Sequence, residues 1–129
     1  MKERKLIYEF VLPKPPSVNN YYGKPKYGNK PYIKKPARNF RKKVIDIIPK
    51  DIFTLDFPLY VEVEQRYGKA KKQMDIDNPF KGLFDALTHS NVWTDDKLVK
   101  SLYTELIEND PKDKKINFVV RIYKYWYLL

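Results

Sequence analysis

The pattern of apolar positions along the chain predicts four β-strands. Residues 59–67 read LYVEVEQRY, in which apolar side chains alternate with polar ones over part of the length. Such alternation is expected of a strand with one buried face. Three further segments are short, rich in β-branched and aromatic residues, and bounded by turn-forming residues, which is typical of strands. These segments are residues 6–12, 99–107 and 116–125.

Two other segments repeat their apolar residues at the spacing of an α-helix. From Phe40 the apolar positions recur at i, i+4, i+7 and i+8, which predicts a helix over residues 37–48. Asn78 and Pro79 form a helix-start signal, in which the Asn side chain caps the first turn and proline takes the first helical position. We expect this second helix to end within residues 88–91.

The segment of residues 13–36 is crowded with Pro, Asn, Gly, Lys and Tyr, and its prolines exclude a helix. We expect a long loop with an embedded hairpin that turns near Gly28 and Asn29. A second hairpin, through the sequence ENDPKDKK, is expected to join the last two strands. The order of elements predicts an α+β fold: a single domain over residues 1–129, with one mixed β-sheet and two helices packed on it.

The charge distribution along the chain indicates what kind of partner the protein binds. The formal net charge is +10, but residues 1–50 hold 14 basic and 3 acidic residues, a balance of +11 that leaves −1 for the rest. A basic half of this kind attracts nucleic acid through counterion release, although a Lys-rich surface alone also fits. The absence of Cys and the single His exclude disulfides and His-rich zinc sites. No apolar run is long enough to span a membrane and the start lacks signal-peptide features, so a cytoplasmic protein is expected.

Residues 75–96 form an acidic stretch in this otherwise basic protein. The stretch contains five Asp residues and only one Lys. If Asp75 and Asp77 lie in an extended segment, their side chains point to the same face. Close carboxylates need a counter-charge, and oxygen-only ligands select Mg²⁺, Mn²⁺ or Ca²⁺. An EF-hand is excluded, because Phe80 and Ala86 take the positions that require Gly and Glu. An open metal site for phosphodiester hydrolysis is therefore one hypothesis.

The residues that follow have a functional and a simpler interpretation. Lys81 shares a helix face with Asn78 and Asp85, where its charge can stabilise a scissile phosphate or merely form a surface ion pair with Asp85. Asp95 and Asp96 diverge in an extended chain, so only one of them is expected to reach a metal while the other caps or pairs. An isolated Asp-x-Asp is itself common in solvated turns.

Aromatic residues are interleaved with lysines in the proline-rich loop. They either pack over the sheet or stack on nucleic-acid bases beside phosphate contacts. His89 is expected to be a loop or helix-end residue rather than a metal ligand. The final YKYWYLL is expected to serve as core or subunit interface. The interleaved residues are Tyr21, Tyr22, Tyr27 and Tyr32 with Lys24, Lys26, Lys30 and Lys34.

The joint spacing of these residues resembles the signature of the RusA family of Holliday junction resolvases. Two motifs carry the resemblance, which spans nearly the whole chain. They are Asp75-x-Asp77-Asn78-x-x-Lys81-x-x-x-Asp85-Ala86-Leu87 followed by Asp95-Asp96-x-x-Val99, and Pro15-Pro16-Ser17-Val18-Asn19 followed by Tyr21-Tyr22.

The resemblance implies a homodimeric endonuclease that binds four-way DNA junctions and makes paired nicks with Mg²⁺ or Mn²⁺, in recombination and repair. It implies metal-binding catalytic acids at Asp75, Asp77 and Asp96 and a catalytic cation at Lys81, with Asn78, Asp85 and Asp95 in support. A nuclease for flaps and a non-catalytic DNA-binding protein are the alternatives. The residues expected to contact DNA are Asn19, Tyr21, Tyr22, Lys24, Lys26, Lys34, Lys35, Arg38, Arg41, Lys42, Lys71 and Lys72.

Overall fold

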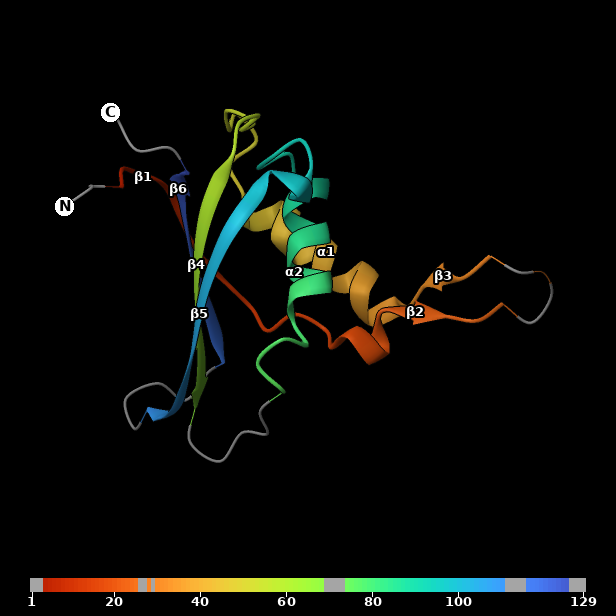
Figure 1. Ribbon diagram of the computed structural model, residues 1–129. Coiled ribbons are helices and arrows are strands. Elements are labelled where there is room, and N and C mark those ends of the chain that lie inside the picture. The colour runs from red at the N-terminus through yellow and green to blue at the C-terminus, as the bar shows by residue number, and fades with distance from the viewer. Residues whose placement is uncertain (1–3, 26–27, 29, 69–73, 111–115, 126–129) are drawn as a thin grey trace.

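A computed structural model of the chain describes residues 4–25, 28, 30–68, 74–110 and 116–125 (Figure 1). It confirms the predicted α+β class, with a mixed four-stranded sheet in the order β1-β6-β4-β5 and two helices on one of its faces. The sheet strands are β1 (Leu6–Leu12), β4 (Leu59–Gly68), β5 (Val99–Asp110) and β6 (Asn117–Lys124). The helices are α1 (Lys35–Ile47) and α2 (Phe80–His89), with 3₁₀ turns η1 (Val18–Asn20) and η2 (Asp96–Leu98).

The predicted hairpin between the last two strands is wrong. β4 lies between β5 and β6, pairing parallel with the first and antiparallel with the second. A parallel pair needs a crossover connection, and α2 supplies it between β4 and β5. β6 then takes the free edge of β4, and β1 pairs with β6. Strands that are consecutive in the sequence are therefore separated in the sheet.

The alternating pattern of β4 builds the core. Its inward positions Leu59, Val61 and Val63 are almost completely buried beneath the helices. Phe40 of α1 and Leu83 of α2 belong to the same buried cluster. Each such aliphatic side chain contributes roughly 1.5–3 kcal/mol when it is fully buried. The helices are thus held to the sheet chiefly by this apolar face.

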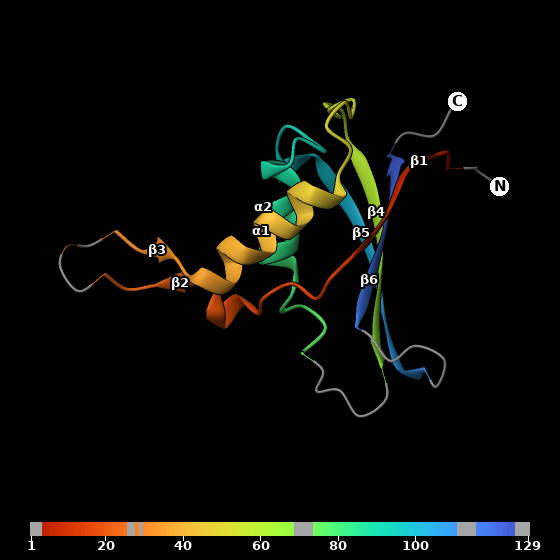
Figure 2. The same ribbon diagram turned by 180° about the vertical axis from the view of Figure 1, so that it is seen from behind.

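The predicted hairpin in the long loop is confirmed. β2 (Tyr22–Gly23) pairs antiparallel with β3 (Tyr32–Ile33), and Gly28 between them adopts a φ of +92°, which favours glycine. The hairpin projects away from the sheet beyond the first turn of α1 (Figure 2). The hairpin therefore extends the molecule beyond the N-terminal end of α1. None of the helices in the described residues has the length and apolar character needed to cross a membrane.

An ion-pair network on the outer sheet face joins three strands. Arg121 of β6 donates to Glu64 of β4 at 2.6 Å and to Glu9 of β1 at 2.7 Å. The hydrogen bond from Arg121 lowers the pKa of Glu64, against the opposing effect of burial, and Arg66 lowers it further. Deprotonated Glu64 is therefore favoured in the folded state.

This network predicts an acid-sensitive contribution to stability. Because the folded pKa of Glu64 is lowered, its contribution is complete above the ordinary value of 4.5 and is lost as pH falls through the folded pKa. We expect Arg121→Gln to reduce the free energy of unfolding at pH 7 by about 1–3 kcal/mol. We also expect a flatter pH dependence below 4.5, measured by urea unfolding. Lys100→Gln, at an exposed position of β5, is the control, and an identical response of both variants would contradict the prediction.

Candidate active site

The acidic segment before α2 is tied to the sheet by β4. Gln65 is completely buried, and its amide nitrogen donates to the Ile76 carbonyl at 2.9 Å and to Thr104 Oγ1 at 3.0 Å. The backbone nitrogen of Met74 lies 3.5 Å from the Tyr67 hydroxyl, which accepts its hydrogen bond. A buried amide without partners is costly, so Gln65 favours one position for this segment. Sequence analysis missed Gln65, although a polar residue at an inward strand position was a visible signal.

The proline-rich loop reaches the same segment from the other side. The Val18 backbone nitrogen donates to the Asn78 carbonyl at 3.0 Å. Gly82 of α2 faces Pro16, and a Cβ at Gly82 would stand 3.0 Å from Pro16 Cγ. Glycine at this position therefore lets the Pro15-Pro16-Ser17 stretch approach the helix. The two sequence motifs, far apart in the chain, meet at the first turns of α2.

The expectation that Asp75 and Asp77 lie in an extended segment is wrong. The Asn78 nitrogen donates to the Asp75 carbonyl at 3.0 Å, and the Phe80 nitrogen to the Asp77 carbonyl at 3.4 Å. The hydrogen bonds of Gln65 with Ile76 and of Val18 with Asn78 hold the segment in these turns. Both Asp side chains are exposed. The prediction that the Asn78 side chain caps this helix is also wrong. α2 begins at Phe80, Pro79 takes the N-cap position, and no side chain caps the helix.

Trp93 anchors the second acidic segment after α2. Its ring is buried against Phe84 with centroids 5.4 Å apart, and its Nε1 donates to Thr88 Oγ1 at 2.6 Å. Asp95 then caps η2 by accepting from the Lys97 nitrogen at 2.9 Å, and this bond lowers the pKa of Asp95. The alternative of a short cap is thus confirmed for Asp95. Asp96, one position on, is half-buried and lies within electrostatic reach of Asp85 and Lys81.

Lys81, Asp85 and Asp96 come together at the meeting point of α2 and this loop. Lys81 Nζ lies 3.3 Å from Asp85 Oδ2, as the helical spacing predicted. Burial raises the pKa of Asp96, as do a hydrogen bond with Asp95 and the nearby charge of Asp85, while Lys81 opposes the shift. Carboxylates are therefore crowded around Asp96, with one ammonium group among them.

Comparison with known proteins identifies the family to which this sequence is similar. The family model described as Endodeoxyribonuclease RusA matches residues 12–123. The protein named crossover junction endodeoxyribonuclease rusA, from Enterobacteria phage HK97, is 38% identical over 93 residues, covering 70% of this chain and 74% of that protein. The chain belongs to the RusA family.

Bacterial members of the RusA family are similar too. The crossover junction endodeoxyribonuclease RusA of Escherichia coli O139:H28 (strain E24377A / ETEC) is 30% identical over 93 residues, covering 71% of this chain and 76% of that protein. The protein of the same name from Escherichia coli strain K12 is 29% identical over an equal length, with the same coverage. Membership of the RusA family makes this chain an endodeoxyribonuclease and favours that class over the non-catalytic alternative.

Tyr21 was predicted to contact DNA, but its side chain is buried in the structure. The side chain is 1% exposed, so it packs into the RusA-family fold rather than offering a face to a base. Its hydroxyl donates to Asp85 Oδ2 and accepts from Arg41 Nη2 at 2.6 Å. Tyr21 and Asp85 lie 64 residues apart, and no local pattern signals their contact. Tyr22, by contrast, is 46% exposed.

Among the described residues, most of the other predicted DNA contacts lie along the projecting hairpin and α1, and Asn19 lies in η1. Arg38 is exposed but donates to the Ile33 carbonyl at 2.8 Å, and Lys34 and Arg41 are half-buried. Lys26, Lys71 and Lys72 fall outside the described residues, as does Tyr27. The exposed residues of the predicted set are Asn19, Tyr22, Lys24, Lys35, Arg38 and Lys42.

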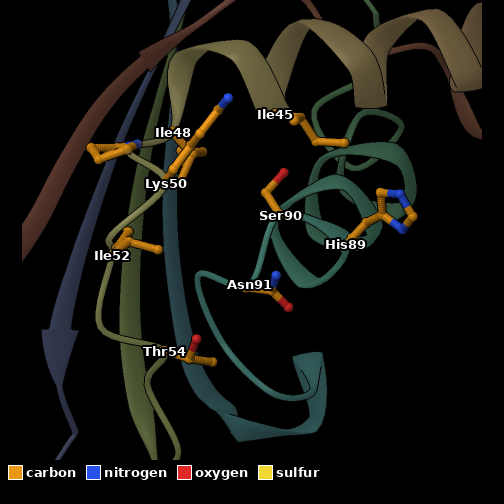
Figure 3. Close-up of a pocket in the computed structure, with 9 residues that line it drawn as sticks. Ile45, Ile48, Lys50, Ile52, Thr54, His89, Ser90 and Asn91 are labelled. Carbon is orange, nitrogen blue, oxygen red and sulfur yellow. The ribbon is translucent and has the colours of Figure 1, made fainter.

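A cleft of about 380 Å³ lies at the C-terminal ends of both helices, lined by Ile45, Lys50, His89 and Asn91 among others (Figure 3). His89 is the last residue of α2, as predicted. Lys81, in contrast, lies in the first turn of the same helix. The cleft is therefore separate from the site that Lys81 helps to form.

The carboxylates of the RusA-family site suit a hard divalent cation by their chemistry. Oxygen donors without Cys select Mg²⁺ or Mn²⁺. Burial raises the pKa of Asp96 first and the neighbouring Asp85 and Asp95 raise it further, and a bound cation would favour the charged form of Asp96. Within the part of the chain that the structure describes, no three acidic or His side chains form a group that could hold a metal ion. Assembly of Asp75 and Asp77 with Asp96 thus stays a prediction.

Proposed function

We propose that this protein is a Mg²⁺-dependent endonuclease that binds four-way DNA junctions and resolves them by paired nicks, in recombination and repair. The observation that carries the proposal is the Lys81–Asp85 pair on α2, at 3.3 Å, with Asp96 of η2 near enough to feel the charges of both, inside a RusA-family fold. The names of the phage and bacterial relatives support the crossover junction as substrate.

Asp75, Asp77 and Asp96 are the residues that would hold the metal in this proposal, with Mn²⁺ as a substitute. The bound cation would supply charge stabilisation and an activated water for phosphodiester hydrolysis. Asp95 supports Asp96, because it caps η2, in whose first turn Asp96 stands, and forms a hydrogen bond with it. Asn78 contributes through its backbone carbonyl, which fixes the loop.

Lys81 acts in this scheme as a permanent cation. Burial alone would lower the pKa of Lys81, but the Asp85 carboxylate and Tyr22 outweigh it and raise the pKa above its usual value. A lysine of this kind stays protonated at neutral pH and does not serve as a base. Its side chain is 41% exposed, so its charge can meet a phosphate that approaches from solvent.

The decisive experiment compares substrates of matched sequence. A mobile four-way junction, a flap and a linear duplex, each end-labelled, are incubated with the protein in Mg²⁺ and in EDTA. We expect symmetric nicks in the junction with Mg²⁺ and none with EDTA. Equal or faster cutting of the flap would favour the branched-DNA nuclease that is the alternative.

Junction binding should depend steeply on salt. Each phosphate contact contributes about 0.9 to the slope of log affinity against log salt concentration, so loss of one contact lowers the slope by that amount. We expect Lys35→Glu and Lys42→Glu, both exposed on α1, to weaken junction binding and to reduce this slope. Arg38 and Arg41 are less suitable, since both also hold the fold together.

Lys50→Glu is the matched control for this salt experiment. Lys50 is exposed, lies beyond the far end of α1, and carries the same charge. Its reversal should leave the slope measured by fluorescence anisotropy near the wild-type value. A flat salt response of the wild-type protein would remove DNA as the partner.

We also propose a homodimer, because a four-way junction presents two equivalent strands and one chain carries one acidic site. A C₂ pair places the two sites symmetrically. Tyr123 and Tyr125 of the proposed interface are half-buried in the described residues, whereas Trp126 and Tyr127 lie outside them. Light scattering at micromolar concentration should give twice the chain mass. A monomeric mass together with full resolution of junctions would overturn the dimer.

A further inference from the structure

Four side chains from three separate elements form one cluster behind the Lys81 ammonium group. Tyr21 follows η1, Arg41 lies on α1, and Lys81 and Asp85 lie on α2. The cluster centres on a single oxygen, Asp85 Oδ2, which accepts from Tyr21, lies 3.3 Å from Lys81 Nζ and lies 4.0 Å from Arg41 Nη2. An acid shared among three neighbours has its position closely defined.

The Tyr21 ring also lies close to Lys81, in addition to the hydrogen bond of its hydroxyl with Asp85. Lys81 Nζ lies 5.6 Å from the centre of the Tyr21 ring and 5.7 Å from that of Tyr22, within the range of cation–π attraction. The two rings meet edge to face with centroids 4.6 Å apart. Lys81 is thus held by its charge partner Asp85 and by two aromatic faces. Tyr21 takes part in both interactions.

Tyr21 itself cannot touch DNA or the reacting phosphate, because it is 1% exposed. Its backbone is fixed as well, since its carbonyl accepts from the Lys34 nitrogen at 2.9 Å at the start of α1. The residue therefore joins the loop, α1 and α2 at the point where Lys81 emerges. A buried phenol that only filled space would not need partners of this charge.

We propose that Tyr21 is a positioning residue for the nicking reaction. Its hydroxyl holds Asp85 between Arg41 and Lys81, and so sets where the Lys81 ammonium stands beside Asp96. This inference rests on the proposed function for its catalytic consequence. The position of Lys81 itself can be measured without any cleavage.

Tyr21→Phe is the direct test, because it removes the hydroxyl and keeps the ring. We expect the single-turnover nicking rate at saturating protein to fall about 10- to 100-fold, as misplacement of a reacting group can cause. The junction dissociation constant should stay within about twofold of the wild type, since no DNA contact is lost. The control is Tyr8→Phe, which also loses a hydroxyl bond, to the Phe53 carbonyl at 2.6 Å, outside the cluster. It should nick at the wild-type rate.

A double-mutant cycle distinguishes positioning from general destabilisation. If Tyr21 acts through Asp85, then Tyr21→Phe combined with Asp85→Asn should nick no more slowly than Asp85→Asn alone. Rate losses that multiply would overturn the inference. So would a Tyr21→Phe protein that melts earlier but nicks normally at a temperature where it is folded, or one that only binds the junction more weakly.

A spectroscopic measurement separates this inference from the proposed function. Reductive ¹³C-methylation of the lysines gives a signal for Lys81, assigned by its loss in Lys81→Arg. We expect Tyr21→Phe to shift that signal and Tyr8→Phe to leave it unchanged. If the wild type does not nick a junction, the proposed function fails, while the Lys81 signal still decides the positioning. An unchanged signal in Tyr21→Phe would overturn the positioning even in an active nuclease.

Discussion

Replacing Asp96 with Asn is expected to abolish Mg²⁺-dependent nicking of a four-way junction while junction binding persists or strengthens. The substitution keeps the size of the side chain but removes the charge that would hold the cation. It also removes a negative charge near the DNA, so repulsion of the phosphates decreases. Asp75→Asn and Asp77→Asn should behave in the same way. The measurement is single-turnover cleavage of labelled junctions, paired with a binding titration in EDTA.

The neighbouring Asp95 provides the control for this result. Asp95 is exposed and caps η2 through the Lys97 nitrogen, so Asp95→Asn should retain most of the nicking activity. Loss of the cap to Ala costs about 1 kcal/mol, and Asn is itself a good cap, so stability should change little. If the variants of Asp75, Asp77 and Asp96 all cut at rates close to the wild type, the acidic site is elsewhere.

The elements of this fold were predictable where a local pattern decides them. The alternation in β4 and the spacing from Phe40 in α1 depend only on which side chains face the core. The pairing of strands was not predictable in the same way. β6 pairs with β4 and β1 rather than with its sequence neighbour β5, a choice set by the crossover through α2. Contacts between distant segments leave no periodic signal in one sequence.

The same distinction between local patterns and distant contacts applies to the candidate active site. The Lys81–Asp85 pair follows from helical spacing, and the structure confirms it. The turn around Asp77 does not follow from spacing, because it is imposed by Gln65 on β4 and by Val18 in the loop. The buried contact of Tyr21 with Asp85 joins segments that are remote in sequence. Residue types and spacing thus indicate the chemistry, while the supporting contacts require the fold.

Replacing Lys81 with Ala is expected to lower the single-turnover nicking rate by about 10²–10³-fold, the loss typical of one charge-stabilising group in a transition state. Lys81 itself is 41% exposed, and Asp85 keeps its contacts with Tyr21 and Arg41, so loss of the ion pair should cost only about 1 kcal/mol and the fold should persist. Binding should weaken only slightly, since one of many positive charges is lost. The rate loss would then reside in the chemical step rather than in DNA binding.

Lys43→Ala is the matched variant for this comparison, because it removes an equal charge from an exposed position of α1. It should nick at nearly the wild-type rate under saturating protein. Urea unfolding and junction titration of both variants identify the cause of any slow cleavage. A Lys81→Ala protein that loses its fold, yet nicks normally per folded molecule, would make Lys81 a structural residue. A rate loss restored by higher protein concentration would make it a DNA contact. A rate loss of about 10²–10³-fold that persists at saturating protein, with folding and binding intact, is the outcome that the proposed role of Lys81 as a permanent cation requires.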